Sequence, residues 1–205
     1  MMAKGRSMLR AYIEDTGEYL SHLLSMYPKL LDEWMQDKEK ECRNVAKDSS
    51  DGDVEVETSI YHSLFQGYES FGETDVLFYD AMFIMVYSYY ESVIMKLSKM
   101  YCCNNKPSEI CEKHKVQLSD EAKNRISFLY NTIRVLRNQF CHNFLGTIGS
   151  RKEKDKQIIN KLIQAYPSMI CYDDNSIHIL KREFISAVLE KERFVLNELI
   201  IKLHI

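Results

Sequence analysis

The stretch ISFLYNTIRVLRNQFCHNF, residues 126–144, decides the fold. Its apolar side chains recur every three or four residues, a spacing that places them on one face of an α-helix. This core stripe consists of Ile126, Leu129, Ile133, Leu136, Phe140 and Phe144. We therefore expect one amphipathic helix, packed by this stripe against other helices, with its polar side chains facing away from the core.

The composition extends this expectation to the whole chain. Of 205 residues, 45% are hydrophobic and 28% are charged, which is ordinary for a globular chain with a sizeable core. Seven Gly and three Pro leave few tight turns, and this argues against a sandwich, a barrel or a dinucleotide-binding fold. The sequence predicts an all-α helical bundle with one short β-hairpin before the C-terminal helix.

Capping residues and breaks in the apolar pattern predict the element bounds. The first helix is expected to kink or break at Pro28, and Thr58 is expected to cap a short helix. Thr74 with Asp75 is expected to cap a long one. The later expected elements are a loop over 102–118 around Pro107, a helix opened by Ser119 and ended by Gly146, a polar helix over 151–166, a hairpin over 169–180 and a last helix over about 182–204.

The helix expected after Thr74 is the most apolar part of the chain. Its large side chains cover more than one stripe, so we expect it to be mostly buried. These side chains are Leu77, Phe83, Ile84, Tyr87, Ile94 and Leu97. The tyrosines of this helix, Tyr87, Tyr89 and Tyr90, are accordingly expected to pack in the core rather than to stack on bases.

Charge is distributed unevenly along the chain, whose formal net charge is −3. The range 32–57 holds ten acidic and four basic residues, and its SSDGD cluster predicts a mobile acidic loop over 47–57. That loop would separate an N-terminal helical region, 1–46, from a helical domain over 58–205, within one compact domain overall. The range 122–156 holds eight basic and two acidic residues, so phosphates are expected to bind there.

Arg137 and His142 point in different directions on a regular helix. At 100° per residue, Arg137 lies about 55° from the centre of the core stripe, and His142 lies about 165° away on the opposite side. One regular helix cannot aim both side chains at one point. Either the helix ends before His142, or a working site is assembled from two copies of the helix related by a twofold axis.

The string RNQFCHN, from Arg137 to Asn143, resembles the RNxxxH signature of the HEPN family. These are small all-helical domains, many of them metal-independent ribonucleases of toxin–antitoxin and phage-defence systems. A long apolar helix with an embedded acid (YSYYESVIMKL, Glu91) precedes the motif, and a short hairpin and a terminal helix follow it, which resembles the abortive-infection-type members. The resemblance covers about residues 75–205. It implies a homodimeric endoribonuclease that acts on RNA without a cofactor, with an antitoxin or defence partner protein.

The chemistry of such a motif can be stated from its residue types. Metal-free RNA cleavage requires a base for the 2′-OH proton, a cation for the charge that grows on the phosphorane, and an acid for the leaving 5′-oxygen. His142 titrates near neutrality and can transfer the protons, and the planar Arg137 can donate two hydrogen bonds to phosphate oxygens. The expected supporting and substrate-binding residues are Asn138, Asn143, Arg134 and Glu91, the last of which either holds Arg137 or fixes the tautomer of His142.

Two other interpretations stay open. The first is a catalytically silent HEPN-like module that binds a nucleotide or RNA or scaffolds a partner, because the same Arg and His can bind a phosphate without cleaving it. The second is a purely structural helical protein in which the motif is a coincidence. A wild-type protein that binds RNA without cleaving it would favour the first.

The cysteines and the apolar runs bear on metal binding and on location. Cys102, Cys103, Cys111 and His114 share one loop and are possible zinc ligands, but without a paired Cys-x2-Cys free thiols are favoured. The longest apolar run, 81–90, is half the length that a bilayer requires, and residues 1–20 are charged throughout. These features predict a cytoplasmic protein with reduced thiols, no bound metal and no membrane contact.

Overall fold

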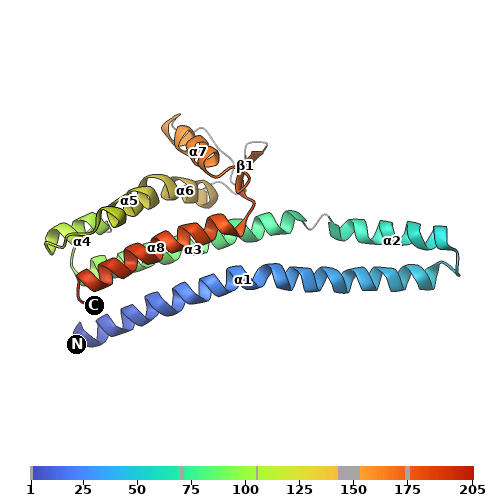
Figure 1. Cartoon of the computed structure of the whole chain (residues 1–205), viewed down its shortest axis with the longest axis horizontal. Helices are drawn as coiled ribbons and strands as arrows, with labels where there is room; N and C mark the ends of the chain where they lie inside the picture. Colours follow the sequence, from blue (N-terminus) through green and yellow to red (C-terminus); the bar gives the residue numbers. More distant parts are fainter. Residues whose placement is uncertain (1, 70–71, 105, 143–152, 174–175) are drawn as a thin grey trace.

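Helices α3 and α8 lie side by side at the centre of the fold and carry about half of its buried apolar side chains (Figure 1). The computed structural model describes residues 2–69, 72–104, 106–142, 153–173 and 176–205. The elements in chain order are α1 (Met2–Ser49), α2 (Val54–Glu69), α3 (Gly72–Met100), α4 (Pro107–Lys113), α5 (Asp120–Phe128), the π-helical turn η1 (Leu129–Ile133), α6 (Arg134–His142), α7 (Glu153–Ala165), β1 (Ile170–Asp173), β2 (Ser176–Ile179) and α8 (Arg182–Lys202). The predicted all-α class with a single hairpin before the last helix is confirmed for these residues.

Two layers cover the central pair of helices. The first half of α1 packs against α3 and α8 on one side, where Ile13 and Leu20 are buried. The continuous segment α5–η1–α6 packs on the other side through the predicted core stripe, whose residues Leu129, Ile133 and Leu136 are fully buried. The stripe prediction is therefore confirmed at its centre, while Phe144 lies outside the described residues.

The tyrosines of α3 belong to the core, as predicted. Tyr87, Tyr89 and Tyr90 are all buried, and the hydroxyl of Tyr89 donates to the carbonyl of Ile13 at 2.8 Å. Leu77, in contrast, was predicted to be buried and is 54% exposed. It lies near the beginning of α3, where no other helix covers this side of α3, so the prediction that the whole apolar face is buried is wrong at that end.

Helix α1 is continuous through Pro28, so of the expected kink or break the break is wrong. A proline inside a helix removes one backbone hydrogen bond and crowds the preceding turn. Here the neighbouring Tyr27 holds the helix against α3. Its ring stacks on Phe78 with 3.5 Å between centroids, and its hydroxyl donates to Asp75 at 2.9 Å. Tertiary packing on both sides of the proline outweighs its local preference.

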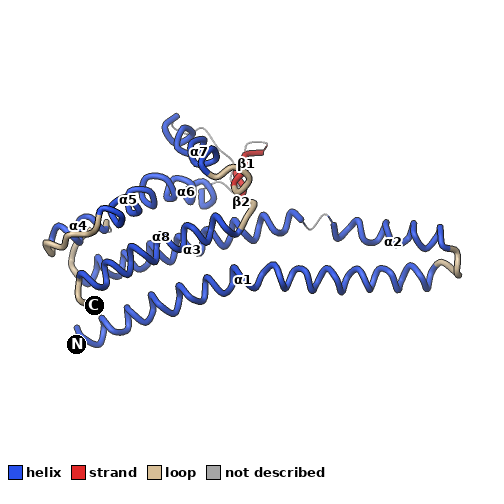
Figure 2. Tube along the Cα trace, viewed as in Figure 1, coloured by secondary structure: helices blue, strands red, loops and turns tan. Residues whose placement is uncertain are grey.

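The second half of α1 and the whole of α2 form a two-helix arm that projects from the core (Figure 2). Helix α1 runs to Ser49 and α2 begins at Val54, so the predicted mobile loop over 47–57 is wrong and shrinks to residues 50–53. Asp53, rather than Thr58, caps α2, because its Oδ1 accepts from the backbone N–H groups of Glu55 (2.9 Å) and Val56 (3.2 Å). Among the described residues, no helix is long and apolar enough to cross a membrane.

The segment predicted as a loop over 102–118 contains a short helix, α4, which is a further correction. Pro107 begins this helix, where its missing N–H costs nothing and its fixed backbone angle suits a first helical turn. Ile110 and Cys111 then bury their side chains against the core. Helix α3 likewise begins at Gly72, two residues before the predicted Thr74 cap.

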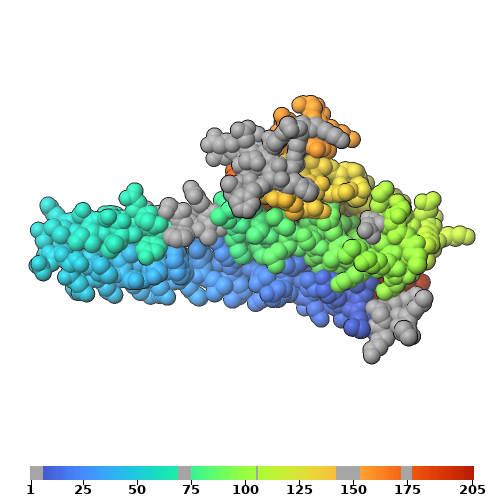
Figure 3. All heavy atoms as spheres, turned by 180° about the vertical axis from the view of Figure 1, so that it is seen from behind, coloured from blue at the N-terminus to red at the C-terminus, as the bar shows by residue number. Residues whose placement is uncertain are grey.

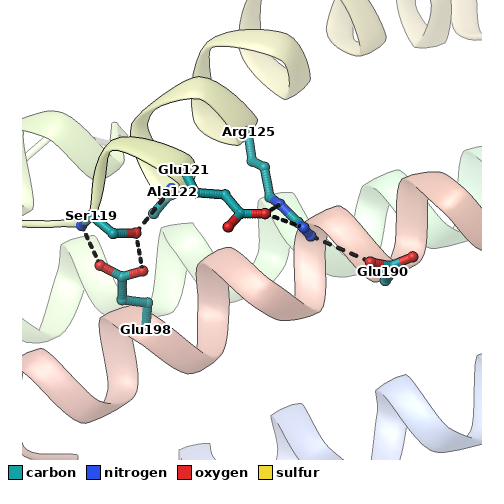
Figure 4. Close-up of polar contacts among 6 residues, drawn as sticks. All are labelled: Ser119, Glu121, Ala122, Arg125, Glu190 and Glu198. Atoms are coloured by element: carbon teal, nitrogen blue, oxygen red, sulfur yellow. Dashed lines mark hydrogen bonds and ion pairs between the residues drawn. The ribbon is translucent and has the colours of Figure 1, made fainter.

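Ser119 opens α5 as predicted and also ties it to α8 (Figure 4). Its Oγ accepts from the N–H of Ala122 at 3.1 Å and donates to Glu198 Oε2 at 2.6 Å, while its own N–H donates to Glu198 Oε1 at 2.5 Å. One turn further, Arg125 pairs with Glu121 at 2.5 Å and lies 3.6 Å from Glu190 of α8. These contacts fix the segment that leads to α6.

The hairpin β1–β2 is confirmed, with Ile170 paired to Ile179 and Cys171 paired to His178 in antiparallel register. Asp80 of α3 anchors it. Its buried carboxylate accepts from the N–H of Ile179 at 2.9 Å and lies 3.1 Å from Nδ1 of His178. Burial raises the pKa of Asp80, against the lowering effect of the two partners. The hairpin is thus held to the core by this carboxylate and by the buried side chains of Ile170, Ile177 and Ile179.

Replacing Asp80 should destabilise the fold because it leaves a buried donor of the hairpin without a partner. We expect Asp80→Ala to lower the free energy of unfolding by about 1–3 kcal/mol and Asp80→Asn, which keeps one oxygen acceptor, to lower it less. Urea denaturation followed by circular dichroism measures both. Asp37 is exposed, so Asp37→Ala serves as the control and should change the free energy of unfolding by less than about 0.5 kcal/mol. Equal effects of Asp80→Ala and Asp37→Ala would contradict the anchoring role.

Candidate functional site

Helix α6 carries both residues of the Arg-x4-His motif and runs from Arg134 through His142. The expectation that the helix could end before His142 is therefore wrong. At 100° per residue, five residues place positions 137 and 142 about 140° apart around the helix axis. The two positions therefore do not share a face of α6, and one copy of this helix does not bring them together.

A π-helical turn precedes α6 and changes its register. Residues Leu129–Ile133 form η1, and a π turn accommodates one more residue than an α turn does. A helical wheel with uniform 100° steps does not include this shift. Gln139, a polar residue of the motif, is fully buried three residues after the buried Leu136 on α6, so the prediction that all polar side chains here face away from the core is wrong. Within the described part of the chain, neither amide atom of Gln139 has a hydrogen-bond partner.

Arg137 is held between α6 and α3 by an ion pair. Its Nη2 contacts Oε1 of Glu91, and the side chains of Arg137 and Glu91 are 17% and 40% exposed. The guanidinium carbon also lies 5.4 Å from the ring centroid of Tyr87, one turn before Glu91 on α3. Burial opposes the charged form, but the hydrogen bond and charge of Glu91 outweigh it and raise the pKa of Arg137. Of the two contacts expected of Glu91, the one with Arg137 is present.

The ion pair leaves part of the guanidinium unused. A guanidinium has five N–H donors, and Glu91 contacts a single nitrogen, Nη2. The Nε of Arg137 is buried and finds no partner among the described residues. The thiol of Cys141, one turn further along α6, also interacts with the guanidinium. An oxyanion cannot reach the buried Nε, so it would have to bind the terminal nitrogens, one of which Glu91 already contacts.

Glu192 of α8 is a buried acid that sequence reasoning missed. It is fully buried, and neither carboxylate oxygen has a partner among the described residues. Burial, together with the charge of Glu91, raises the pKa of Glu192 well above its usual range, so the protonated form is favoured inside the protein. The signal was in the sequence: Glu192 follows Val188 and precedes Val195 and Leu196 at helical spacing, which places it on the core face.

The remaining predicted site residues are placed only in part. Arg134 is half-buried, with its guanidinium 4.7 Å from the ring centroid of Tyr130 one turn earlier. Asn138 is also half-buried, on the turn of α6 that carries Arg137. His142 is the last residue of α6, and only its backbone is described. Asn143 lies outside the described residues. Gly146, predicted to end this helix, also lies outside them.

The cysteine-rich loop holds no metal cluster. Within the described residues no group of three or more His, Cys, Asp or Glu side chains is arranged to hold a metal ion. Burial raises the pKa of Cys111 to about 11, and His114 packs its ring against Tyr101 at 4.4 Å between centroids. Cys102, Cys103 and Cys111 are free thiols.

Comparison of the chain with models of known protein families, with curated proteins and with solved structures finds no match. The function must therefore be argued from the residues of the site themselves. The residues that carry this argument are Glu91, Arg137 and Glu192, together with the motif that ends at His142.

The buried Glu192 gives stability a testable dependence on pH. An acid whose pKa is raised on folding stabilises the native state only while it is protonated, so its contribution is lost as pH rises above the ordinary value of 4.5. We expect the melting temperature of the wild type to fall more steeply than that of Glu192→Gln between about pH 5 and about pH 8. Thermal denaturation in a pH series measures this. Glu190→Gln, on the exposed face of α8, should keep the wild-type slope. Parallel slopes for the wild type and Glu192→Gln would contradict this assignment.

Proposed function

We propose that this chain is a metal-independent endoribonuclease of the HEPN type, which acts in the cytoplasm as a toxin or a phage-defence component. The observation that carries the proposal is the half-buried Arg137, fixed by Glu91 on the helix that continues to His142. A cation held in this way is oriented before substrate arrives, which is how charge-stabilising groups in active sites lower a barrier. The free thiols of Cys102 and Cys141 fit a reducing compartment.

The reaction proposed is a transesterification within the RNA backbone. His142 takes the proton of a 2′-OH, and the 2′-oxygen attacks the adjacent phosphorus. Arg137 donates hydrogen bonds to the phosphorane oxygens as negative charge grows on them. The bond to the 5′-oxygen breaks, and that oxygen takes up a proton from a histidine in its acid form. The products are a 2′,3′-cyclic phosphate and a 5′-hydroxyl.

The active unit proposed is a homodimer with a composite site. Positions 137 and 142 are about 140° apart on α6, so Arg137 of one copy and His142 of another can meet only across a twofold axis. The two motifs would lie within about 10 Å of each other, with Arg134, Asn138 and Asn143 beside them. In each such pair of one Arg137 and one His142, the histidine that takes the 2′-OH proton can then return a proton to the leaving 5′-oxygen.

A second candidate function is a silent HEPN-like module that binds RNA or a nucleotide and scaffolds a partner such as an antitoxin. One observation favours it. The side chain of Arg137 is only 17% exposed and is already paired with Glu91. These are the properties expected of an arginine whose role is to hold α6 to α3. The two functions differ in one measurable respect, because only the first leads to broken phosphodiester bonds.

Substitution of either motif residue should abolish most cleavage. We expect Arg137→Ala and His142→Ala each to reduce the rate of RNA cleavage at least about 100-fold, the usual scale for a positioned acid–base or charge-stabilising group. Cleavage of a labelled RNA, resolved on a denaturing gel, measures the rate. The wild-type activity should survive EDTA, and it should disappear when the cleaved position carries a deoxyribose.

The control for this experiment is Arg43→Ala, which removes a paired but exposed arginine of α1 on the arm, far from the motif and from the contacts that hold α5 to α8. It should retain cleavage. EDTA-sensitive cleavage would refute the mechanism even if the protein were a nuclease. A wild-type protein that binds RNA and never cleaves it would support the silent module instead.

Mixing two inactive variants tests the composite site. In a heterodimer of Arg137→Ala and His142→Ala, one site combines the intact Arg137 of one chain with the intact His142 of the other. Because half of randomly paired dimers are heterodimers, each with one intact site of two, we expect recovery of up to about a quarter of wild-type cleavage. Co-expression of differently tagged chains followed by the gel assay measures this recovery. If each site takes both residues from a single chain, the mixture stays inactive.

A further inference from the structure

Two adjoining cavities form one groove along α3, α4 and the α5–η1–α6 segment. Their volumes are about 490 and about 590 Å³, and both are lined by Lys106, Pro107 and Tyr130, so the two spaces adjoin at these residues. We call this the α4 groove. It lies on the molecular face on which α3 (green), α4 (yellow-green) and the α5–η1 segment (yellow) meet in Figure 3.

The charge of the α4 groove is positive. Lys106, Lys123 and Arg134 line it, and Glu91 is the single carboxylate among its described lining residues. Because Glu91 is paired with Arg137, its charge is largely neutralised within the protein. The two lysines contact acidic residues near by, Lys123 with Asp120 at 2.8 Å and Lys106 with Glu109 at 3.5 Å. Exposed pairs of this kind contribute little to stability, so the lysines can turn to a phosphate at little cost.

An aromatic ring lies at the junction of the two cavities. Tyr130 lines both, and the guanidinium of Arg134 lies 4.7 Å from its ring centroid. Rings and guanidinium planes flanked by cations stack on unpaired bases, and the cations follow the phosphate backbone. The side chains of Ser88, Asn104 and Asn131 add polar groups that can contact a 2′-hydroxyl or a base edge.

The groove leads to the ion pair of the candidate site. Glu91 contributes to its wall and pairs with Arg137, and Tyr87 both lines the groove and faces the Arg137 guanidinium at 5.4 Å. A chain bound in the groove therefore approaches Arg137 from the α3 side. A duplex does not fit this arrangement, because its bases are stacked on one another and offer no free face to Tyr130.

We propose that the α4 groove binds single-stranded RNA and guides it to Arg137. This inference rests on the proposed ribonuclease function, which it deepens by naming the form of the substrate and its path. Lys106, Lys123 and Arg134 contact successive phosphates, and Tyr130 stacks on a base between them.

The test uses the full-length chain and a fluorescein-labelled single-stranded oligoribonucleotide with 2′-O-methyl riboses, which cannot be cleaved by 2′-oxygen attack. Fluorescence anisotropy in a salt series measures its affinity. We expect the double variant Lys106→Gln/Arg134→Gln to bind at least about tenfold more weakly. A plot of the logarithm of the binding constant against the logarithm of the salt concentration should have a slope smaller in magnitude by about 1.4. Each phosphate of a single strand that a cation no longer neutralises reduces this slope by about 0.7. Lys40→Gln on the arm, an exposed lysine far along α1, should bind as the wild type does.

The ring of Tyr130 is tested by a matched pair. Tyr130→Phe keeps the stacking face and should retain the wild-type affinity for the oligonucleotide. Tyr130→Leu keeps an apolar side chain without the ring, so its affinity should be about fivefold lower or more, which corresponds to about 1 kcal/mol or more per stacked base. Circular dichroism of each variant confirms that the helices are intact. Equal affinities of the two Tyr130 variants would overturn the stacking role.

Several outcomes overturn the proposal as a whole. They are a wild-type protein that does not bind the oligonucleotide, groove variants that bind it as tightly as Lys40→Gln does, and a duplex of the same sequence that binds equally well. Failure of the proposed function is distinguishable from these. If the groove variants lose binding while the wild type cleaves no unmodified RNA, the result supports RNA binding by the α4 groove and contradicts the proposed ribonuclease function. If the wild type cleaves RNA and the groove variants bind and cleave it equally well, the result supports the proposed ribonuclease function and contradicts RNA binding by the α4 groove.

Discussion

The ion pair between Glu91 and Arg137 is the interaction on which the candidate site depends. It joins the central helix α3 to α6, and it places a cation where most of its surface is removed from water. Removal of Glu91 would leave the largely buried guanidinium of Arg137 without its partner, which is more costly than loss of a fully exposed pair. The pair thus fixes the position of α6 and the direction of the guanidinium together.

Unsatisfied polar groups gather around this ion pair. The Nε of Arg137, the amide of Gln139 and the carboxyl group of Glu192 are all buried without partners among the described residues. Each such group costs about 1–3 kcal/mol of stability, and apolar residues would avoid that cost. Of these groups, Glu192 lies close enough to Glu91 for the charge of Glu91 to raise its pKa, and Gln139 follows Arg137 by two residues on α6. Exceptions to the rules of stability are expected most often at sites that bind or react.

The sequence predicted those parts of the fold that local chemistry decides. The core stripe, the Ser119 cap and the hairpin followed from spacing and residue type, and all three are present. The errors arose where tertiary contacts override local preference, as at Pro28, which packing of its neighbour on α3 holds within one helix. In the site, Glu91 was found because an acid in an apolar helix stands out. Gln139 and Glu192 were missed because helical spacing was read for apolar residues alone.

A composite site requires that two copies of α6 face each other across a twofold axis. Cys141 tests this directly, because it is an exposed thiol next to His142, and Cys102 provides an exposed thiol at the far end of α3 as its control. A short thiol-specific crosslinker should join two wild-type chains, and gel electrophoresis should show the crosslinked dimer with Cys102→Ser but not with Cys141→Ser. A wild type that yields no crosslinked dimer, or a dimer lost with Cys102→Ser and kept with Cys141→Ser, would contradict a composite site at this helix.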